Sequence, residues 1–532
     1  MDNLINIKTL FNSIKNLLNL LSFPFVSAFS IVIFVIIYTK TSINCYLLSL
    51  FFIIPLLPVL VISLIKKRYR LIISTIFIGF IIFLFVLRIT NIEDQYNLAL
   101  KSINKSTGSI GYVNDFPIRK NGKLELQFKI LGIKTLDVND FILVKPFSIR
   151  IRINDSDLNI SNLNISKGNT FIINQKIILP QEKVFNYQYR KNLFYRGIYG
   201  TINLKKQNLI TTNLNLSPSY YNFLNKSFWK LRESLLSKLK NNLNDDSYGF
   251  ILSIFFGIRS EMNVGVNDDF RISGMLHLLA ISGLHIGFIG GFFLLFFRLF
   301  LSKSLSFFLS LIILTFYVLL ILISPSSARA YIMYFIQASL FIIGFTSSSL
   351  AIISISAIIL LFYNPFFLFN VGFQLSFLAT IGIVIFSKDL NDILFILPLN
   401  KPKAVLSIFI AAFLSLFFVQ WVLFERAYIF SILTSIIMIP LFEIIFIILF
   451  FAIIFIGLSN LFILSHLVDF IVSIYLKLVY YSAFIFPLDL PKINPILGYS
   501  LIPISFILLY LIISNISGIK NSFLKSKKPI HY

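Results

Sequence analysis

Stretches of about 20 mostly apolar residues recur along the chain, and they constrain its fold more than any other feature. Wound as a helix at 1.5 Å per residue, such a stretch crosses the ~30 Å hydrocarbon core of a bilayer. The composition agrees, because 57% of the 532 residues are hydrophobic and only 13% are charged. These values exclude an ordinary soluble protein, a disordered chain, a disulfide scaffold and a transmembrane β-barrel. We therefore expect a polytopic α-helical membrane protein.

The apolar runs predict about twelve spans, interrupted once by a water-exposed segment at about residues 90–246. The first run is interpreted as an anchor and not as a cleaved signal peptide, because a second run follows after only residues 40–42. The single cysteine, Cys45, lies in the second run, so the water-exposed segment must fold without a disulfide. The expected spans lie near residues 23–39, 43–65, 71–89, 271–297, 305–324, 331–345, 349–363, 371–387, 404–424, 428–457, 461–486 and 496–516.

The basic residues predict the orientation of these spans. The cluster Lys-Lys-Arg-Tyr-Arg at 66–70 is expected on the cytoplasmic side by the positive-inside rule. Both termini then lie in the cytoplasm, and residues 91–246 lie outside the inner membrane. With this arrangement fifteen basic residues fall in cytoplasmic segments and four in the short outer loops.

Between residues 108 and 214 the hydrophobic period shortens to two, as in half-buried antiparallel strands. Five or six short strands in about 100 residues are typical of a small β-barrel of the oligonucleotide-binding (OB) type. The fold class expected is thus a helical membrane protein with an inserted, exported, OB-like β-barrel. The predicted strands lie at 109–113, 124–130, 141–145, 149–153, 170–179 and 198–203, with turns at 121–122 and 167–169.

Residues 90–246 carry 23 basic and 12 acidic side chains, which is +11 of the +24 net charge of the chain. Cations that follow phosphates and rings that stack on bases are what single-stranded DNA binding requires. A solvated strand face and a docking segment would show the same pattern. The DNA-binding candidates are Arg150, Arg152, Tyr187, Tyr189, Arg190, Lys191, Tyr195 and Arg196.

Residues 220–246 place Trp229 and several leucines among lysines, which predicts an amphipathic helix. Two placements are compatible with this pattern: one on the membrane surface and one packed against the protein core.

The most distinctive segment carries His277, Ser282 and His285 into an apolar run. Intramembrane histidine and serine are costly unless they face a wet path or a partner. The two histidines would lie about 80° apart on one helix, so both could face one lumen; hydrogen-bonded packing is the alternative, and two histidines do not make a metal site. Gly283 and Gly287, four residues apart, would let another helix approach closely.

Residues Leu276–Gly287 read LHLLAISGLHIG. This segment resembles, almost letter for letter, the signature of the ComEC competence family, the inner-membrane channel proteins of natural DNA transformation. Further segments that resemble the family are Ser326–Ala330 after Pro325, Asn364-Pro365 followed by Gly372–Phe377, and Phe185–Arg190 with Leu193 and Arg196–Ile198.

The resemblance implies an inner-membrane channel for single-stranded DNA, with the barrel outside guiding one strand to the pore. It also implies a cytosolic DNA translocase and external DNA-delivery or pilus proteins as partners. The chain has no GxxxxGK[ST] phosphate loop, and the membrane potential opposes anion entry by about 2.3 kcal/mol per charge per 100 mV. The channel is therefore expected to be a passive conduit.

Three departures from the family pattern limit which properties of the family can be expected of this chain. The HxHxDH metal motif of the nuclease domain found in many members is absent, since the four histidines are 277, 285, 466 and 531. We therefore assign no nuclease, catalytic residue, metal or cofactor to this chain. Two alternatives stay open: the protein relies on a separately encoded nuclease, or it keeps the fold but does not import DNA. A cysteine pair of some members is missing, and Asn186 stands where the family usually has Asp.

The family motifs supply the candidate pore residues. Arg329, just after Pro325, could face an anion together with the first amides of its helix, or could anchor the outer membrane interface. Gln374 with Gly372, Ser376 and Thr380 forms a polar ridge, which helix packing alone would also explain. The pore candidates are Arg271, His277, Ser282, Gly283, His285, Gly287, Arg329, Gly372, Gln374 and Ser376.

Two other functions are compatible with a polytopic chain: a secondary transporter and a glycan or lipid transferase of the cell envelope. The first would show an inverted repeat, and none is evident. The second would need outward-facing acid and base residues, and the outer loops offer little beyond Glu425, Arg426 and Asp489. A pore within one chain and a pore between copies both fit the sequence.

The sequence divides into five expected parts, each with its own composition. They are a three-span anchor at 1–90, the OB-like domain at 91–215, amphipathic or interfacial helices at 216–260, the channel domain at 261–516 and a basic cytoplasmic tail at 517–532.

Overall fold

The computed structural model describes residues 69–485 and parts of 508–516, apart from short internal segments. Several predicted features lie outside these residues: the spans at 23–39 and 43–65, Cys45, most of the span at 496–516, the tail, and Glu425, Arg426 and Asp489. The internal segments not described are 115–117, 121–122, 136–139, 155–168, 181–189, 191–192, 195, 205–207, 212–218, 280, 322–323, 346, 395–399, 425–430 and 460–461.

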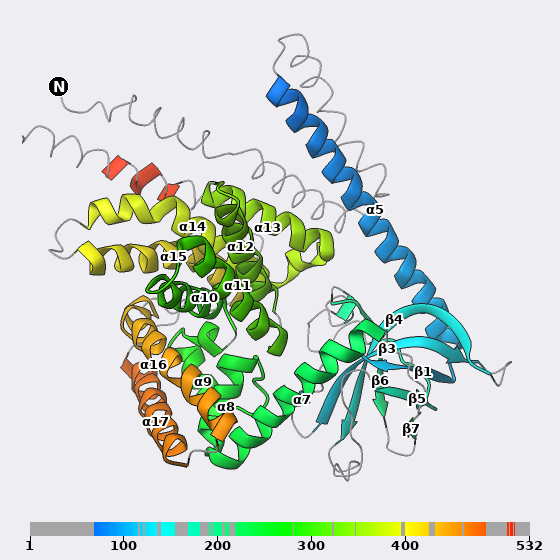
Figure 1. Cartoon of the computed structure of the whole chain (residues 1–532). Helices are drawn as coiled ribbons and strands as arrows, with labels where there is room; N and C mark the ends of the chain where they lie inside the picture. Colours follow the sequence, from blue (N-terminus) through cyan, green and yellow to red (C-terminus); the bar gives the residue numbers. More distant parts are fainter. Residues whose placement is uncertain are drawn as a thin grey trace, which may run out of the picture.

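Helices make up most of the described chain, and a small β-sheet lies at one end of the molecule (Figure 1). The long helix α5 (Tyr69–Lys105) leads into the sheet, and α7 (Ser219–Asn242) leads from it to the remaining helices. These are α8 (Asp245–Ile251), the π-helix η3 (Leu252–Phe256), α9 (Val264–Ile272), the 3-10 helix η4 (Leu276–Leu279), α10 (Gly283–Arg298), α11 (Lys303–Leu320), α12 (Pro325–Ile342), α13 (Ser349–Tyr363), the 3-10 helix η5 (Pro365–Phe369), α14 (Val371–Ile393), α15 (Asn400–Phe424), α16 (Ser431–Ser459) and α17 (Phe462–Ile485).

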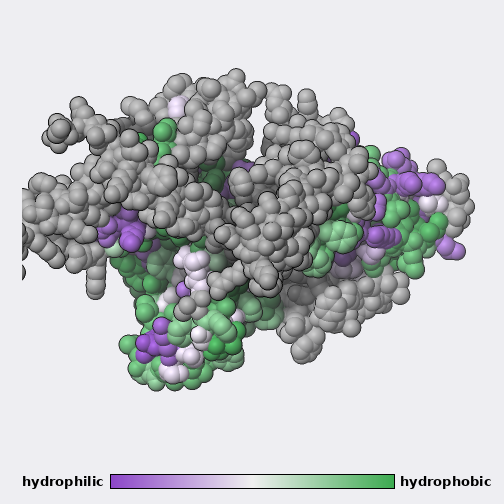
Figure 2. All heavy atoms as spheres, turned by 90° about the horizontal axis from the view of Figure 1, so that it is seen from above, coloured by the Kyte–Doolittle hydropathy of each residue, from purple (hydrophilic) through white to green (hydrophobic). Residues whose placement is uncertain are grey.

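Four of the described helices, α11, α14, α16 and α17, are long and apolar enough to cross a membrane. Shorter apolar helices lie at Gly283–Arg298, Ser349–Tyr363 and Lys403–Phe417. Among the residues coloured in Figure 2, hydrophobic ones predominate over the helices, and hydrophilic ones are more frequent at the end that carries the sheet. The described residues therefore support a membrane protein, while the total of twelve spans stays a prediction.

The predicted span at 271–297 was wrong in one respect, because it is not a continuous helix. Helix α9 ends at Ile272, and Gly274 adopts a left-handed conformation with φ +76°, which a residue with a Cβ rarely adopts. The short helix η4 follows, and a new helix, α10, begins at Gly283. The apolar composition continues through the break, so hydropathy alone could not reveal it.

The sheet contains seven strands in the order β6-β4-β3-β1-β5-β7, with β2 paired to β3. All pairs are antiparallel except β4 with β6, which is parallel. An isolated bridge between Ile178 and Thr201 brings the segment after β5 beside β6. The strands predicted at 141–145 and 149–153 form one strand. The bounds are β1 (Gly108–Val113), β2 (Ile118–Lys120), β3 (Lys123–Lys134), β4 (Ile142–Asn154), β5 (Thr170–Ile173), β6 (Ile198–Leu204) and β7 (Leu209–Thr211).

One face of the sheet forms a core with the end of α5. Phe128 and Ile151 are fully buried there, and Ala99 and Ile103 of α5 pack into the same cluster. Each such large side chain stabilises the fold by about 1.5–3 kcal/mol through burial. The alternating polar positions of β3 and β4 face the other way, as the period of two predicts.

Helix α7 confirms the predicted amphipathic helix, and its second half packs against the protein. Leu239 is fully buried in the large helical core, and Leu243, just after the end of the helix, is buried in the same cluster. The Lys238 Nζ atom donates a hydrogen bond of 2.6 Å to the carbonyl of Gly457 near the end of α16. For this half of the helix, the placement in the core is therefore the one observed.

Candidate functional site

The start of α12 places Arg329 between helices. Pro325 occupies the first turn, and Ser324 caps the helix by accepting a hydrogen bond from the Ser327 amide at 3.1 Å. Ser327 Oγ in turn accepts one from the Ser324 amide at 2.9 Å. This reciprocal cap fixes the first turn. The prediction that a helix starts at Pro325 is confirmed, and Arg329 lies one turn inside it.

The Arg329 side chain is buried, with 7% of its surface exposed. Its Nε atom donates to Ser376 Oγ at 2.8 Å, and one terminal nitrogen donates to Thr380 Oγ1 at 2.6 Å. The same nitrogen lies 3.1 Å from Met333 Sδ. Placement of the guanidinium inside the helix assembly argues against the alternative in which Arg329 anchors the outer interface.

Arg329 makes no ion pair with any carboxylate among the residues that the structure describes. Its polar partners in that part of the chain are neutral hydroxyls and a thioether. Arginine stays charged in proteins, and a buried charge that is surrounded only by neutral dipoles is costly to hold. The place where Arg329 of α12 meets α10 and α14, called the junction below, therefore carries positive charge with no carboxylate partner among the described residues.

The start of α10 meets Arg329 from the other side. Ser282 caps α10 by accepting from the Leu284 amide at 3.2 Å. A Cβ atom on Gly283 would lie only 2.6 Å from Arg329 Nη2, so a larger residue here would require the guanidinium to shift. Ser324 Oγ also donates to the carbonyl of Ile281 at 3.2 Å. The positive ends of α10 and α12 are thus brought together beside a cation.

Helix α14 completes the junction. Ser376 and Thr380 lie one turn apart on one face, and Ser376 Oγ also accepts from Ser326 Oγ at 2.9 Å. Only part of the predicted polar ridge contacts Arg329. Gln374 does not contact Arg329; its Nε2 donates to the carbonyl of Leu368 at 2.8 Å. Gly372 is exposed at the start of the helix.

The two histidines do not share a helix, so the predicted common face is not formed. His277 is exposed on η4, with Nδ1 3.2 Å from the Gly274 carbonyl. His285 is fully buried in α10, and its Nδ1 accepts from the Ser282 amide at 3.0 Å. Its ring packs edge-on against Phe442 and Phe446. His285 therefore serves the cap and the packing of α10, which was the alternative to a role in the lumen.

Close approach between α10 and α12 occurs at Gly283 and Gly290, and not at Gly287. Gly287 is exposed, and a Cβ atom there would meet nothing within 4 Å. At Gly290 a Cβ would lie 2.8 Å from the Tyr334 ring, and Tyr334 Oη donates to the Gly290 carbonyl at 3.1 Å. The contribution of Gly290 was missed because its partner lies 44 residues away in sequence.

Arg271 lies apart from this junction. It is exposed on α9 and pairs with Asp268 at 3.1 Å, one turn earlier. An exposed pair of this kind contributes little to stability.

The DNA-binding candidates fall into two groups. Arg150 and Arg152 lie on the outer face of β4, where Arg152 Nε donates to Glu125 Oε1 of β3 at 2.7 Å. Arg190 and Arg196 lie in the segment before β6; Arg190 Nε donates to the Pro180 carbonyl at 2.8 Å, and Arg196 is exposed. The remaining candidates, Tyr187, Tyr189, Lys191 and Tyr195, lie outside the described residues.

The described aromatic side chains near β6 take part in docking. Phe194 packs on Tyr96 of α5, with ring centroids 4.8 Å apart, and on Phe366 of η5, 4.9 Å apart. Arg88 of α5 also donates to the Tyr363 carbonyl at 2.9 Å. Part of the segment at 185–198 therefore joins the sheet to the membrane helices, as the docking alternative predicts.

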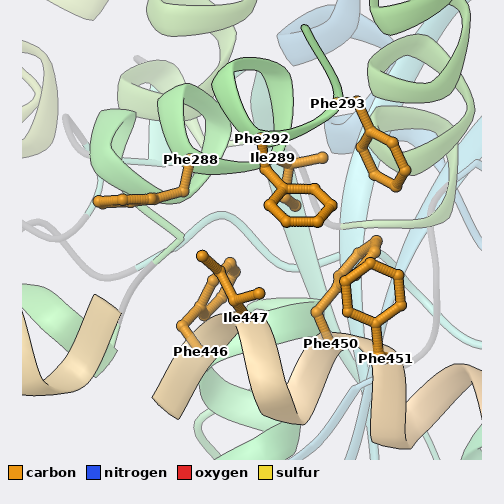
Figure 3. A pocket seen from close by; sticks show the side chains of 8 residues that line it. All are labelled: Phe288, Ile289, Phe292, Phe293, Phe446, Ile447, Phe450 and Phe451. Atoms are coloured by element: carbon orange, nitrogen blue, oxygen red, sulfur yellow. The ribbon is translucent and has the colours of Figure 1, made fainter. Parts of the chain in front are cut away.

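A cleft between α10 and α16 is lined only by apolar side chains (Figure 3). Four residues of α10 face four of α16 across it. A phosphate in this cleft would find no polar partner, so it is unsuited to an anion. The lining residues are Phe288, Ile289, Phe292, Phe293, Phe446, Ile447, Phe450 and Phe451.

The family model described as Competence protein matches residues 254–515, which include Gly283, Arg329, Ser376 and Thr380. The chain belongs to the competence protein family. Its family and its apolar helices make this competence protein a multi-pass inner-membrane protein.

Two relatives are similar to this competence protein over part of their length. ComE operon protein 3 of Bacillus subtilis (strain 168) is 32% identical over 164 residues, which are 31% of this chain and 21% of that protein. An uncharacterized protein of Aquifex aeolicus (strain VF5) is 30% identical over 162 residues, 30% of this chain and 38% of that protein. No solved structure matches the chain.

In the described part of this competence protein, no group of three or more His, Cys, Asp or Glu residues could hold a metal ion. The described site is therefore built from one arginine, hydroxyl groups and helix ends.

Proposed function

We propose that this protein is an inner-membrane channel through which single-stranded DNA enters the cell during natural transformation. Membership of the competence family supports a role in DNA uptake. The observation that carries the channel role is Arg329, which is buried, has no carboxylate partner among the described residues, and lies where α10 and α12 begin. A strand crossing an apolar barrier needs fixed positive charge to offset each phosphate.

We infer that the sheet is an OB-type barrel. In its favour, β1 pairs with both β3 and β5, β3 pairs with β4, and β4 pairs in parallel with β6. The Ile178–Thr201 bridge links the segment after β5 to β6, which would close a five-stranded barrel. In OB domains the second and third strands form the face that binds oligonucleotides. Those strands correspond to β3 and β4, whose outer positions include Lys123, Lys129, Arg150 and Arg152.

The arrangement of helix ends favours a path from this face to Arg329. The starts of α10, α12 and α14 meet at one level, and Phe366 joins that level to the sheet. Arg298 and Lys388 lie toward the opposite ends of α10 and α14. By the positive-inside rule those ends face the cytoplasm, and the sheet lies outside.

The channel is passive in this proposal. A cytosolic translocase would pull the strand, external DNA-delivery proteins would present it, and a separate nuclease would remove the complementary strand. The strand would contact the outer face of β4 first and the Arg329 junction second.

Substitution of Arg329 tests the proposal, with transformation frequency and membrane abundance as the measurements. Arg329→Met removes the charge and should abolish transformation, while Arg329→Lys keeps the charge and should retain part of it. Arg298→Gln at the exposed end of α10 is the control and should change transformation little. Normal transformation by an abundant Arg329→Met protein would overturn the proposal, and so would equal loss in the methionine and lysine variants.

A further inference from the structure

An aromatic cluster, called the seat below, joins the sheet to the membrane helices. It consists of Tyr96, Phe194, Tyr199 and Phe366. Phe194 packs against Tyr96 and Phe366, with ring centroids 4.8 and 4.9 Å away. Tyr199, the second residue of β6, packs against Tyr96 at 5.4 Å. Tyr199 and Phe366 are both buried. Ring pairs at these distances and angles are favourable beyond the burial of their area, so the seat is a specific contact.

The seat is attached to the first turns of α14. Phe366 belongs to η5, whose first turn is capped by Asn364 Oδ1, which accepts from the Phe366 amide at 3.0 Å. Two residues later in the same turn, the Leu368 carbonyl accepts from Gln374 Nε2 at 2.8 Å. Asn370 then caps α14 by accepting from the Phe373 amide at 3.2 Å. Residues from Phe366 to Gln374 are thus held as one unit.

The same turns of α14 hold Arg329. Gln374 is two residues before Ser376 and six before Thr380, whose hydroxyls accept from the guanidinium. A helix transmits displacement of one turn to the next because its backbone hydrogen bonds are continuous. Arg329 also packs closely against α10, because a Cβ atom on Gly283 would overlap the guanidinium. A shift of η5 must therefore change how Arg329 is held.

Helix α5 provides a second, fixed attachment. Ile82, Phe85 and Ile89 are buried in a cluster with α13 and α14 residues, and Phe85 contacts Phe362 at 6.0 Å. The sheet is therefore attached at two places: firmly through α5 and more locally through Phe194. A force on the sheet would rotate the sheet around its attachment to α5 and would displace η5 through Phe194.

We propose that Phe194, Phe366 and Gln374 are positioning residues that couple the seat of the sheet to Arg329. Displacement of Phe194 moves η5, and Gln374 passes that movement to Ser376 and Thr380. The use of this coupling in DNA entry rests on the proposed function, since the force would then come from a strand bound to the sheet. The mechanical link itself requires no DNA.

Hydrogen exchange in the full-length protein in detergent, without DNA, tests the link. Phe194→Ala should speed amide exchange in the first turns of α14, from Val371 to Thr380, by about fivefold, the size expected from losing one interaction of ~1 kcal/mol. Gln374→Leu should have the same effect. Phe147→Ala is the matched control, because Phe147 is buried in the core of the same sheet and its loss should speed exchange only within the strands.

Unchanged exchange in α14 for both Phe194→Ala and Gln374→Leu would overturn the proposal, and so would an equal change in Phe147→Ala. If Phe194→Ala does not accumulate, Phe194→Leu keeps most of the apolar volume and removes the ring contact with Phe366. Because no DNA is present, these outcomes are independent of whether Arg329→Met abolishes transformation.

Discussion

Gly283 and Arg329 touch across two helices: a Cβ atom at position 283 would lie 2.6 Å from Arg329 Nη2. The two residues belong to different motifs, 46 positions apart, and come together where α10 and α12 begin. The contact leaves no free space between Gly283 and the guanidinium.

Gly283→Ala should displace the Arg329 guanidinium or separate α10 from α12, because the added methyl group has no space. Overpacking of this kind costs about 1–3 kcal/mol. Thermal unfolding of the purified protein should show the loss, and transformation should fall. Gly287→Ala is the matched control, since a Cβ there meets nothing within 4 Å. Equal behaviour of the two variants would contradict the packing described.

Thr380→Val should weaken the junction by removing one of the two hydroxyls that hold Arg329. A hydrogen bond to a buried charge contributes about 1.5–3 kcal/mol, and the valine has the same shape as threonine. In a double-mutant cycle with Arg329→Met, the effects on unfolding should be strongly non-additive. Thr90→Val in α5 serves as the control, because Thr90 donates to the Val86 and Leu87 carbonyls within its own helix. Additive effects would show that Thr380 acts independently of Arg329.

Arg150→Gln should lower the affinity of the full-length protein for single-stranded oligonucleotides. Loss of one phosphate contact should reduce the slope of log affinity against log salt by about 0.7. Glu125→Gln should do the reverse and increase affinity, because it removes a negative charge from this face, 2.7 Å from Arg152. Fluorescence anisotropy over a salt series measures both. If neither variant changes binding, the outer face of β4 is not the DNA-binding surface.

Lys238→Met should loosen α7 from α16. Its Nζ donates at 2.6 Å to the Gly457 carbonyl, close to the negative end of α16, and loss of that bond should cost about 1–2 kcal/mol in unfolding free energy. Lys240→Met, two residues on and exposed, is the control and should be close to neutral. A larger loss in the control would show that charge on α7, and not this contact, stabilises the helix.

Local patterns were sufficient to predict many of the elements. Continuous apolar runs matched α11, α13 and α17, and alternation of period two matched β3 and β4, because burial on one or both faces determines those patterns. The Pro325 signal correctly placed the start of α12. These features depend on near neighbours in sequence.

What sequence did not predict depends on distant partners or on chemistry hidden inside apolar runs. The break before α10 could have been suspected from Gly274 and from Ser282 three residues before His285, which together end one helix and cap another. The pairing of Arg329 with Thr380, and of Gly290 with Tyr334, joins separate helices. No periodicity within one segment encodes those contacts.

The seat of the sheet has a consequence for biosynthesis. Phe194 is made roughly 170 residues before Phe366, its partner in η5. At ribosomal speeds of about 5–20 residues per second, Phe194 must wait ~10–30 s for that partner to be synthesised. During this interval the sheet can complete its own core, because its strands are already made, but its aromatic edge has no place to dock. The nascent protein therefore exposes this aromatic surface for a time. Delayed insertion of α13 and α14 should lengthen that time and increase the risk of aggregation.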